Sequence, residues 1–243
     1  MFKILLFDLD GTLIRVDMKI FIKEYFRELG DHLSHIIPPL KLQEHLKYST
    51  RVMIENQDPG TTNREVFWKA FSERVDNPRE LLEEEIENFY RYRFKNLKVF
   101  TDIHPRARQV LAEAQKMGHQ LVLATNPVFP FTAIRQRMEW GKVHDFPYQL
   151  ITSYENMHFC KPSPGYFQEI LDKVGGNPRE CLMIGNDIQE DLAAARLGIK
   201  TFLVEDFLVD RGNPSLQADY RGKLEELSSF LGEVKEGSLK TSP

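Results

Sequence analysis

The sequence predicts an α/β fold: a parallel sheet covered by helices on both faces, with a block of helices inserted after the first strand. Three observations support this fold class. A short apolar run, 4–7, ends directly in carboxylates; residues 17–98 carry only helical periodicity; and from about residue 100 apolar strands alternate with amphipathic helices. The first strand precedes the helical block and the others follow it, so the block is an insertion.

The first strand is the most informative element. Residues 4–7 are all apolar, as expected for a strand buried on both faces, and Asp8 and Asp10 follow at once. Residues two apart on an extended chain share a face, so both carboxylates should enter one pocket. That pocket lies at the carboxyl end of the strand, where open α/β sheets bind ligands. Two carboxylates held together require a cation, a shared proton or water.

The inserted block should contain four helices. Gly30 can end the first, and Asp58-Pro59-Gly60 forms a turn after a second helix over 40–56. Asn63 can cap the third helix, and Asn77-Pro78 opens the fourth. The first helix is indicated by an apolar stripe with helical spacing: Met18, Phe21, Ile22, Tyr25, Phe26 and Leu29.

The rest of the chain alternates between strands and helices, and its small, polar end, 232–243, is expected to be a frayed tail. Glycines that follow the apolar stripes mark the ends of several helices. Strands are predicted over 120–124, 148–152, 181–184 and 201–204, and helices over 105–117, 131–140, 163–174 and 188–197.

Composition narrows the classes of function. The chain has 243 residues, 42% hydrophobic, and a net charge of −4, which does not favour binding to nucleic acid. No apolar run approaches the roughly 20 residues that a membrane span needs, and we expect a cytoplasmic protein. The two cysteines, Cys160 and Cys181, show no metal or redox spacing.

Further polar residues follow other predicted strands. Thr125 and Asn126 follow the strand over 120–124, Asp187 follows 182–186, and Asp191 lies one helical turn later. Lys161 lies in the loop before the helix that Ser163 caps. Because parallel strands end at one edge of a sheet, these residues should meet Asp8 and Asp10 in one crevice.

Each of these residues also has a purely structural interpretation. Asp187 and Glu190 fit a helix capping box, and Asp191 could be a first-turn carboxylate favoured by the helix dipole. The segment around Thr125 could be only a turn, and that around Lys161 only a loop. Their combination with two aspartates after an apolar strand favours a site.

The combination resembles the haloacid dehalogenase-like hydrolases. Phe7-Asp8-Leu9-Asp10-Gly11-Thr12-Leu13 is similar to the first motif of that superfamily, and Thr125 to the second. Lys161-Pro162 matches the third motif, and Gly185-Asn186-Asp187 with Asp191 matches the fourth. The resemblance implies a Rossmann-like core over 1–16 and 99–243 and a helical cap domain over 17–98, with hinges near 15–17 and 99–102.

The resemblance also implies covalent catalysis. Asp8 would attack phosphorus to give an aspartyl-phosphate. Asp10 would protonate the leaving oxygen and later deprotonate the water that cleaves the intermediate. Lys161 would neutralise charge, while the Thr125 side chain and the Asn126 amide would bind phosphate oxygens.

A Mg²⁺ ion is the implied cofactor, because it prefers oxygen ligands and bridges carboxylates to phosphate. Its ligands would be Asp8, the backbone carbonyl of Asp10 and the side chain of Asp187. Asp191 would support these ligands without binding the metal itself, or would orient Lys161.

The sequence therefore predicts a Mg²⁺-dependent phosphatase acting on a small phosphorylated metabolite, as a monomer or small homo-oligomer. Asp10 favours phosphate chemistry, since the dehalogenases of the superfamily lack an aspartate at that position. Two alternatives stay open: a phosphomutase of the same fold, and a binding or regulatory module without catalysis.

Overall fold

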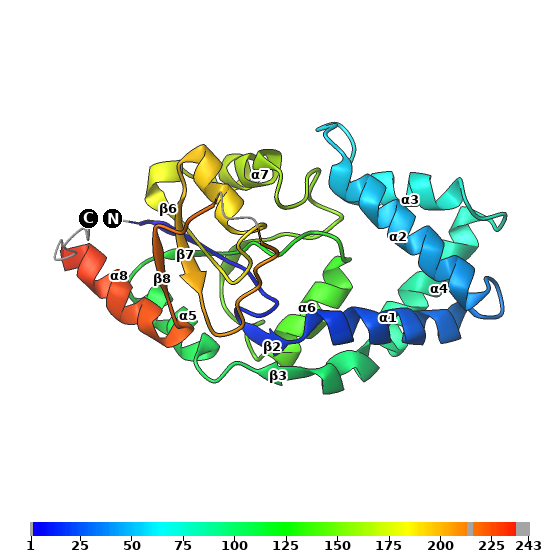
Figure 1. The fold of residues 1–243 in the computed structure, drawn as a ribbon, viewed down its shortest axis with the longest axis horizontal. Helices are drawn as coiled ribbons and strands as arrows, with labels where there is room; N and C mark the ends of the chain where they lie inside the picture. The colour runs from blue at the N-terminus through cyan, green and yellow to red at the C-terminus, as the bar shows by residue number, and fades with distance from the viewer. Residues whose placement is uncertain (1, 213–215, 237–243) are drawn as a thin grey trace.

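The computed structural model describes residues 2–212 and 216–236. Its core is a six-stranded parallel sheet of order β5-β4-β1-β6-β7-β8 (Figure 1). The strand order reverses at β1, which lies between β4 and β6, so the end of β1 is the switch point at which such sheets bind ligands. The strands are β1 (Ile4–Phe7), β4 (Gln120–Leu123), β5 (Tyr148–Ile151), β6 (Cys181–Gly185), β7 (Lys200–Val204) and β8 (Tyr220–Gly222).

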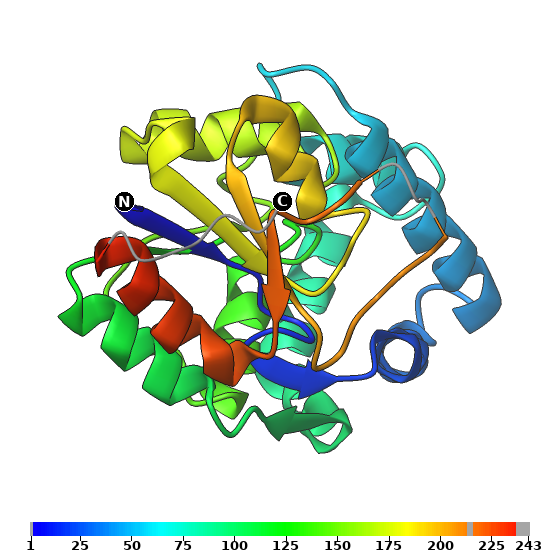
Figure 2. The ribbon, with the colours of Figure 1, turned by 60° about the vertical axis from the view of Figure 1, so that its left-hand side comes forward.

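Helices cover both faces of the sheet, as predicted (Figure 2). Leu5 and Phe7 of β1 pack into one apolar cluster with α5 (Ala107–Lys116) and α8 (Leu227–Glu236). Ile4 and Leu6 point to the opposite face and pack with α7 (Pro164–Val174) and the 3₁₀ segment η3 (Leu192–Leu197). The two-residue alternation of a strand therefore divides the core into two layers.

The inserted helices, α1 to α4, lie beside the sheet, on the right in Figure 1. They are α1 (Met18–Leu33), α2 (Pro39–Glu55), α3 (Asn63–Ser72) and α4 (Arg79–Tyr92), followed by η1 (Phe94–Phe100). The two connections to the core pair with each other as antiparallel strands, β2 (Ile14–Val16) and β3 (Thr101–Ile103). The sequence predicts these connections only as hinges, because a three-residue strand leaves little periodicity.

Several predicted boundaries were wrong. Gly30 does not end α1, which continues to Leu33; the glycine instead allows a close approach, because a Cβ there would lie 3.3 Å from the Cβ of Pro39. Thr62, not Asn63, caps α3 through a reciprocal capping box with Glu65.

The end of the chain also differs from the prediction. The helix expected over 188–197 is a turn followed by η3. Residues 232–236 belong to α8, whose apolar face packs on the sheet, so they are not frayed; the rest of the predicted tail, 237–243, lies outside the described residues. Sequence analysis also missed β8, a strand of only three residues. None of the helices within 2–212 and 216–236 is long and apolar enough to cross a membrane.

The start of α3 contacts two loops of the core. The Asn63 amide donates to the Met157 carbonyl at 2.8 Å, and the Arg64 amide donates to the Tyr154 carbonyl at 2.8 Å. The buried Asn63 side chain adds a bond to the Phe159 carbonyl at 3.2 Å. These bonds fasten the inserted helices to the loop that leads into Lys161.

Candidate active site

The backbone that carries Asp8 is fixed by its neighbours. The Asp8 amide donates to the Ile184 carbonyl at 2.9 Å, which extends the β1–β6 pairing beyond the strand. The chain then turns at Gly11, where φ is +86° and a Cβ would lie only 2.3 Å from Asn186 Nδ2. Thr12 Oγ1 donates to Asn186 Oδ1 at 3.2 Å. A glycine is therefore required for the first loop to pack against the loop after β6.

Lys161 joins two of the predicted aspartates. Its buried Nζ lies 2.9 Å from Asp8 Oδ1 and 2.6 Å from Asp191 Oδ1. The second oxygen of Asp191 accepts from the Asp187 amide at 2.9 Å. Gly185 makes room for this arrangement, because a Cβ there would lie 2.1 Å from Asp191 Oδ2. The structure thus brings together residues from the loop after β1, the loop before α7 and the loop after β6.

Burial makes it unfavourable for the carboxyl groups of Asp8 and Asp191 to ionise. Desolvation raises the pKa of Asp8 to about 6, although Lys161 acts in the opposite direction. Desolvation likewise raises the pKa of Asp191 to about 7. Burial alone would lower the pKa of Lys161, but the two carboxylates hold it well above its usual value. One cation is therefore shared by two buried carboxylates, and the site is short of positive charge.

Asp187 lies at the same edge but is paired with a residue that sequence analysis did not consider. Arg211 donates from Nη1 to Asp187 Oδ1 at 2.7 Å, and its Nη2 lies 2.7 Å from Oδ2. Asp187 Oδ1 also accepts from the amides of Gln189 and Glu190 at 3.0 Å each. The capping interaction proposed as the structural alternative is therefore present at Asp187, although no α-helix follows. The Glu190 side chain accepts instead from Asn126 Nδ2.

Thr125 and Asn126 lie directly after β4. The Thr125 side chain is buried, and its carbonyl accepts from Thr152 Oγ1 at 2.7 Å and from the Tyr166 hydroxyl at 2.9 Å. Asn126 Oδ1 accepts from the Lys161 amide at 3.2 Å, and Nδ2 donates to Glu190 Oε2 at 3.1 Å. Asn126 therefore fixes the loop that carries Lys161.

Asp10 has a partner that was also missed. Asp10 Oδ2 accepts from Nη1 of Arg137, a buried residue of α6 (Phe131–Trp140). A sequence signal was available, because Arg137 falls on the buried stripe of this helix with Ala133, Ile134 and Met138. A charge in an apolar stripe is buried only with a partner.

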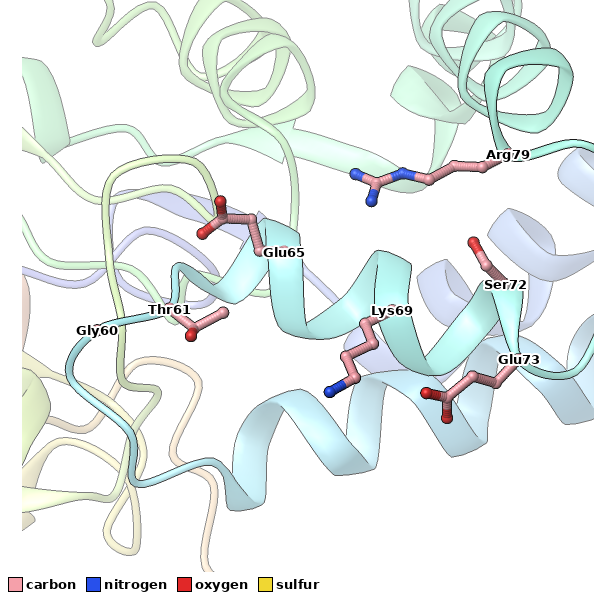
Figure 3. A pocket seen from close by; sticks show the side chains of 7 residues that line it. All are labelled: Gly60, Thr61, Glu65, Lys69, Ser72, Glu73 and Arg79. Atoms are coloured by element: carbon pink, nitrogen blue, oxygen red, sulfur yellow. The ribbon is translucent and has the colours of Figure 1, made fainter.

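A surface hollow elsewhere on the molecule does not belong to this site. It has a volume of about 570 Å³ and lies along α3, open to solvent (Figure 3). Its lining contains none of the residues that gather around Asp8; it is formed by Gly60, Thr61, Glu65, Lys69, Ser72, Glu73 and Arg79.

A parallel sheet with buried, ionisable groups in contact at its switch point is typical of α/β enzymes. Residues 2–198 match the sequence model of the haloacid dehalogenase-like hydrolases, and the chain belongs to this family. The fold and family predicted from the sequence are therefore confirmed.

Curated relatives and solved structures agree with this assignment. A phosphoserine phosphatase of Thermus thermophilus is 33% identical over 181 residues, which are 72% of this chain and 66% of that protein. A phosphoglycolate phosphatase of Pseudomonas savastanoi pv. phaseolicola is 24% identical over 94% of this chain and 78% of its own length. The crystal structure of a HAD phosphatase from Thermococcus onnurineus superimposes with a TM-score of 0.59 at 21% identity, covering 95% of this chain and 98% of the other.

Proposed function

We propose that this protein is a Mg²⁺-dependent phosphatase that hydrolyses a small phosphomonoester through an aspartyl-phosphate on Asp8. The observation that carries the proposal is the buried contact of Lys161 with both Asp8 and Asp191. A further carboxylate, Asp10, lies two residues after Asp8. The named relatives act on phosphoserine and phosphoglycolate, which are both small phosphomonoesters.

The chemistry follows from these positions. Lys161 holds Asp8 Oδ1, so the other oxygen attacks phosphorus while the bond from phosphorus to the leaving oxygen breaks. Asp10 gives its proton to that leaving oxygen, and the alcohol departs. Asp10 then takes a proton from water, the water oxygen attacks phosphorus, and inorganic phosphate leaves as the Asp8 carboxylate is restored. Thr125 and the Asn126 amide bind the phosphate oxygens.

The residues present fit a magnesium ion. Asp8 and Asp187 offer carboxylate oxygens and Asp10 a backbone carbonyl, which are the hard ligands that Mg²⁺ prefers. The bound ion would offset the repulsion between Asp8 and the substrate phosphate. Within the described residues no group of three or more acidic, histidine or cysteine side chains is already gathered as a metal site. Carboxylates nevertheless outnumber cations here: Asp8, Asp10, Asp187, Glu190 and Asp191 against Lys161, Arg137 and Arg211.

The inserted helices are proposed to act as the cap domain, over 17–98, on a core formed by 1–16 and 99–243. Bonds from Asn63 and Arg64 to core carbonyls support this, because they join the cap to the loop before Lys161. The chain passes between core and cap through the paired strands β2 and β3, and the cap would pivot there. Such a lid favours small metabolites over phosphoproteins.

A panel of small phosphomonoesters assayed with MgCl₂ tests this function. We expect release of inorganic phosphate from at least one member, loss of the activity in EDTA, and recovery when Mg²⁺ is restored. Absence of phosphate release across the panel, or full activity in EDTA, would contradict the proposal. Sugar phosphates belong in the panel, because a phosphomutase would interconvert isomers without releasing phosphate.

Arg211 should compete with the metal for Asp187. Its guanidinium is half-exposed and bonds both carboxylate oxygens, a pairing worth about 1 kcal/mol. Arg211→Gln should therefore lower the Mg²⁺ concentration at the midpoint of a calorimetric binding titration, by about five-fold. The matched control is Arg221→Gln, which breaks an exposed pair with Glu205 and should leave that midpoint unchanged. An unchanged midpoint in Arg211→Gln would show that the guanidinium does not oppose the metal.

A further inference from the structure

Arg137 is the most unusual charged residue of the described chain outside the predicted motifs. It belongs to α6, and only 1% of its surface is exposed. Removing a guanidinium from water costs several kcal/mol unless it gains close partners.

Asp10 is the only carboxylate with which the described structure pairs this cation. Arg137 Nη1 donates to Asp10 Oδ2, and the guanidinium carbon lies 4.7 Å from the centre of the Phe129 ring. Within the described residues, Nε and Nη2 have no hydrogen-bond partner. The guanidinium of Arg137 therefore contacts one carboxyl oxygen and one aromatic face, and both contacts hold the side chain against Asp10.

The two carboxyl oxygens of Asp10 have different surroundings. Asp10 Oδ2 is held by Arg137, whereas Asp10 Oδ1 is buried and has no hydrogen-bond partner among residues 2–212 and 216–236. The backbone of Asp10 is fixed too, by its bridge to Ile14 and by the bond from the Gly11 amide to the Ile14 carbonyl at 2.9 Å. A buried acceptor without a donor is costly, and such groups commonly mark functional atoms.

We propose that Arg137 is the positioning residue for proton transfer to the leaving group. By holding Asp10 Oδ2, it fixes the carboxyl group so that Oδ1 meets the leaving oxygen of the substrate. In the substrate complex Asp10 carries a proton on Oδ1; this proton passes to the leaving oxygen as its bond to phosphorus breaks, and Asp10 regains a proton from the water that cleaves the aspartyl-phosphate. This inference rests on the proposed function, in which Asp10 is the general acid and base.

The surroundings of Arg137 link this positioning to the inserted helices. The adjacent residue, Gln136, donates from Nε2 to the Tyr90 carbonyl of α4 at 2.7 Å. Phe129, beneath the guanidinium, packs edge-on against Tyr25 of α1 with ring centres 5.4 Å apart. Arg137 therefore lies where the core meets the inserted helices, so Asp10 is oriented at their interface.

Leaving groups of different basicity test this role. An alkyl phosphate such as glycerol 2-phosphate needs a proton on its leaving oxygen, whereas 4-nitrophenyl phosphate releases a stable phenolate. In Arg137→Met, kcat/KM for the alkyl phosphate should fall by about 100-fold, the lower range of general acid catalysis. For the aryl phosphate kcat/KM should change by less than about three-fold. This constant reports only the steps up to departure of the leaving group, and the phenolate departs without a proton.

The second half of the reaction supplies an independent signature. Asp10 must also activate the water that cleaves the aspartyl-phosphate, so this step should become slow in Arg137→Met. The aryl phosphate should then show a lower kcat, a lower KM and a burst of nitrophenolate equal to the enzyme concentration. A residue that only supports the fold would lower kcat/KM for both substrates equally and give no burst.

Two further variants complete the test. Arg135→Met removes an exposed arginine from the same helix, one that pairs with Glu139, and should leave activity on both substrates unchanged. Arg137→Lys keeps the charge on a shorter side chain and should show the same selective loss, but a smaller one; it also decides the matter if circular dichroism shows that Arg137→Met does not fold. Equal losses on both substrates, or no loss on either, would overturn the inference. If the wild-type protein hydrolyses neither substrate nor any of the panel, the proposed function fails instead.

Discussion

Asp8→Asn should reduce phosphatase turnover by at least about 10³-fold, since a neutral amide cannot attack phosphorus. The fold should survive, because asparagine has the same shape and can still accept a hydrogen bond from Lys161. Burial already raises the pKa of Asp8 to about 6, so the loss of its negative charge removes a group whose ionised form is costly to bury. Steady-state phosphate release and thermal unfolding of the variant measure the two effects.

The intermediate provides the decisive control for Asp8. Wild-type protein quenched in acid during turnover should carry one phosphoryl group on the peptide that contains Asp8, detectable by mass spectrometry. Asp8→Asn should carry none. Normal turnover by the variant, or a phosphoryl group on another residue, would refute Asp8 as the nucleophile.

Lys161→Met should damage both catalysis and stability. Lys161 is the only cation that the described structure pairs with Asp8 and Asp191, at 2.9 and 2.6 Å. Methionine has a similar length but no charge, so two buried carboxylates would lose their partner. Breaking a buried ion pair from one side costs about 3–5 kcal/mol, and we expect a loss of this size in the free energy of unfolding at pH 8.

The loss should shrink at lower pH. Asp8 and Asp191 already have folded-state pKa values of about 6 and 7, above the ordinary aspartate value of 3.8, and removal of Lys161 raises them further. The folded state then holds protons that the unfolded state has released. Stability of the variant therefore falls as pH rises from the unfolded-state pKa of 3.8 through the raised folded-state pKa values. At pH 5 both carboxyl groups should be largely protonated, and the variant should recover much of its stability.

Urea unfolding in EDTA at pH 5 and pH 8 measures this difference. The control is Lys173→Met, which breaks a more exposed pair with Glu169 on α7 and should cost less than about 1 kcal/mol at either pH. A destabilisation of Lys161→Met that is the same at both pH values would contradict the assigned coupling.

The core of the fold could be predicted from local pattern. The apolar run of β1 packs into both clusters, and the alternation after residue 100 gave four further strands and most of their helices. The convergence of Asp8, Lys161, Asp187 and Asp191 followed from one rule, that parallel strands end at one edge of the sheet. The structure places these four residues together, while their catalytic roles stay predictions.

Sequence by itself therefore determined the fold class, the family and the residues that meet around Asp8, because strand burial and motif order are local properties of the chain. Only the tertiary structure decided which arginines pair with Asp10 and Asp187. Arg137 meets Asp10 across 127 positions, and Arg211 meets Asp187 from a loop beyond β7. The physical reason is that the apolar stripe of α6 can indicate that Arg137 is buried, but not which carboxylate it meets, because a pairing between distant side chains depends on where helices and loops pack.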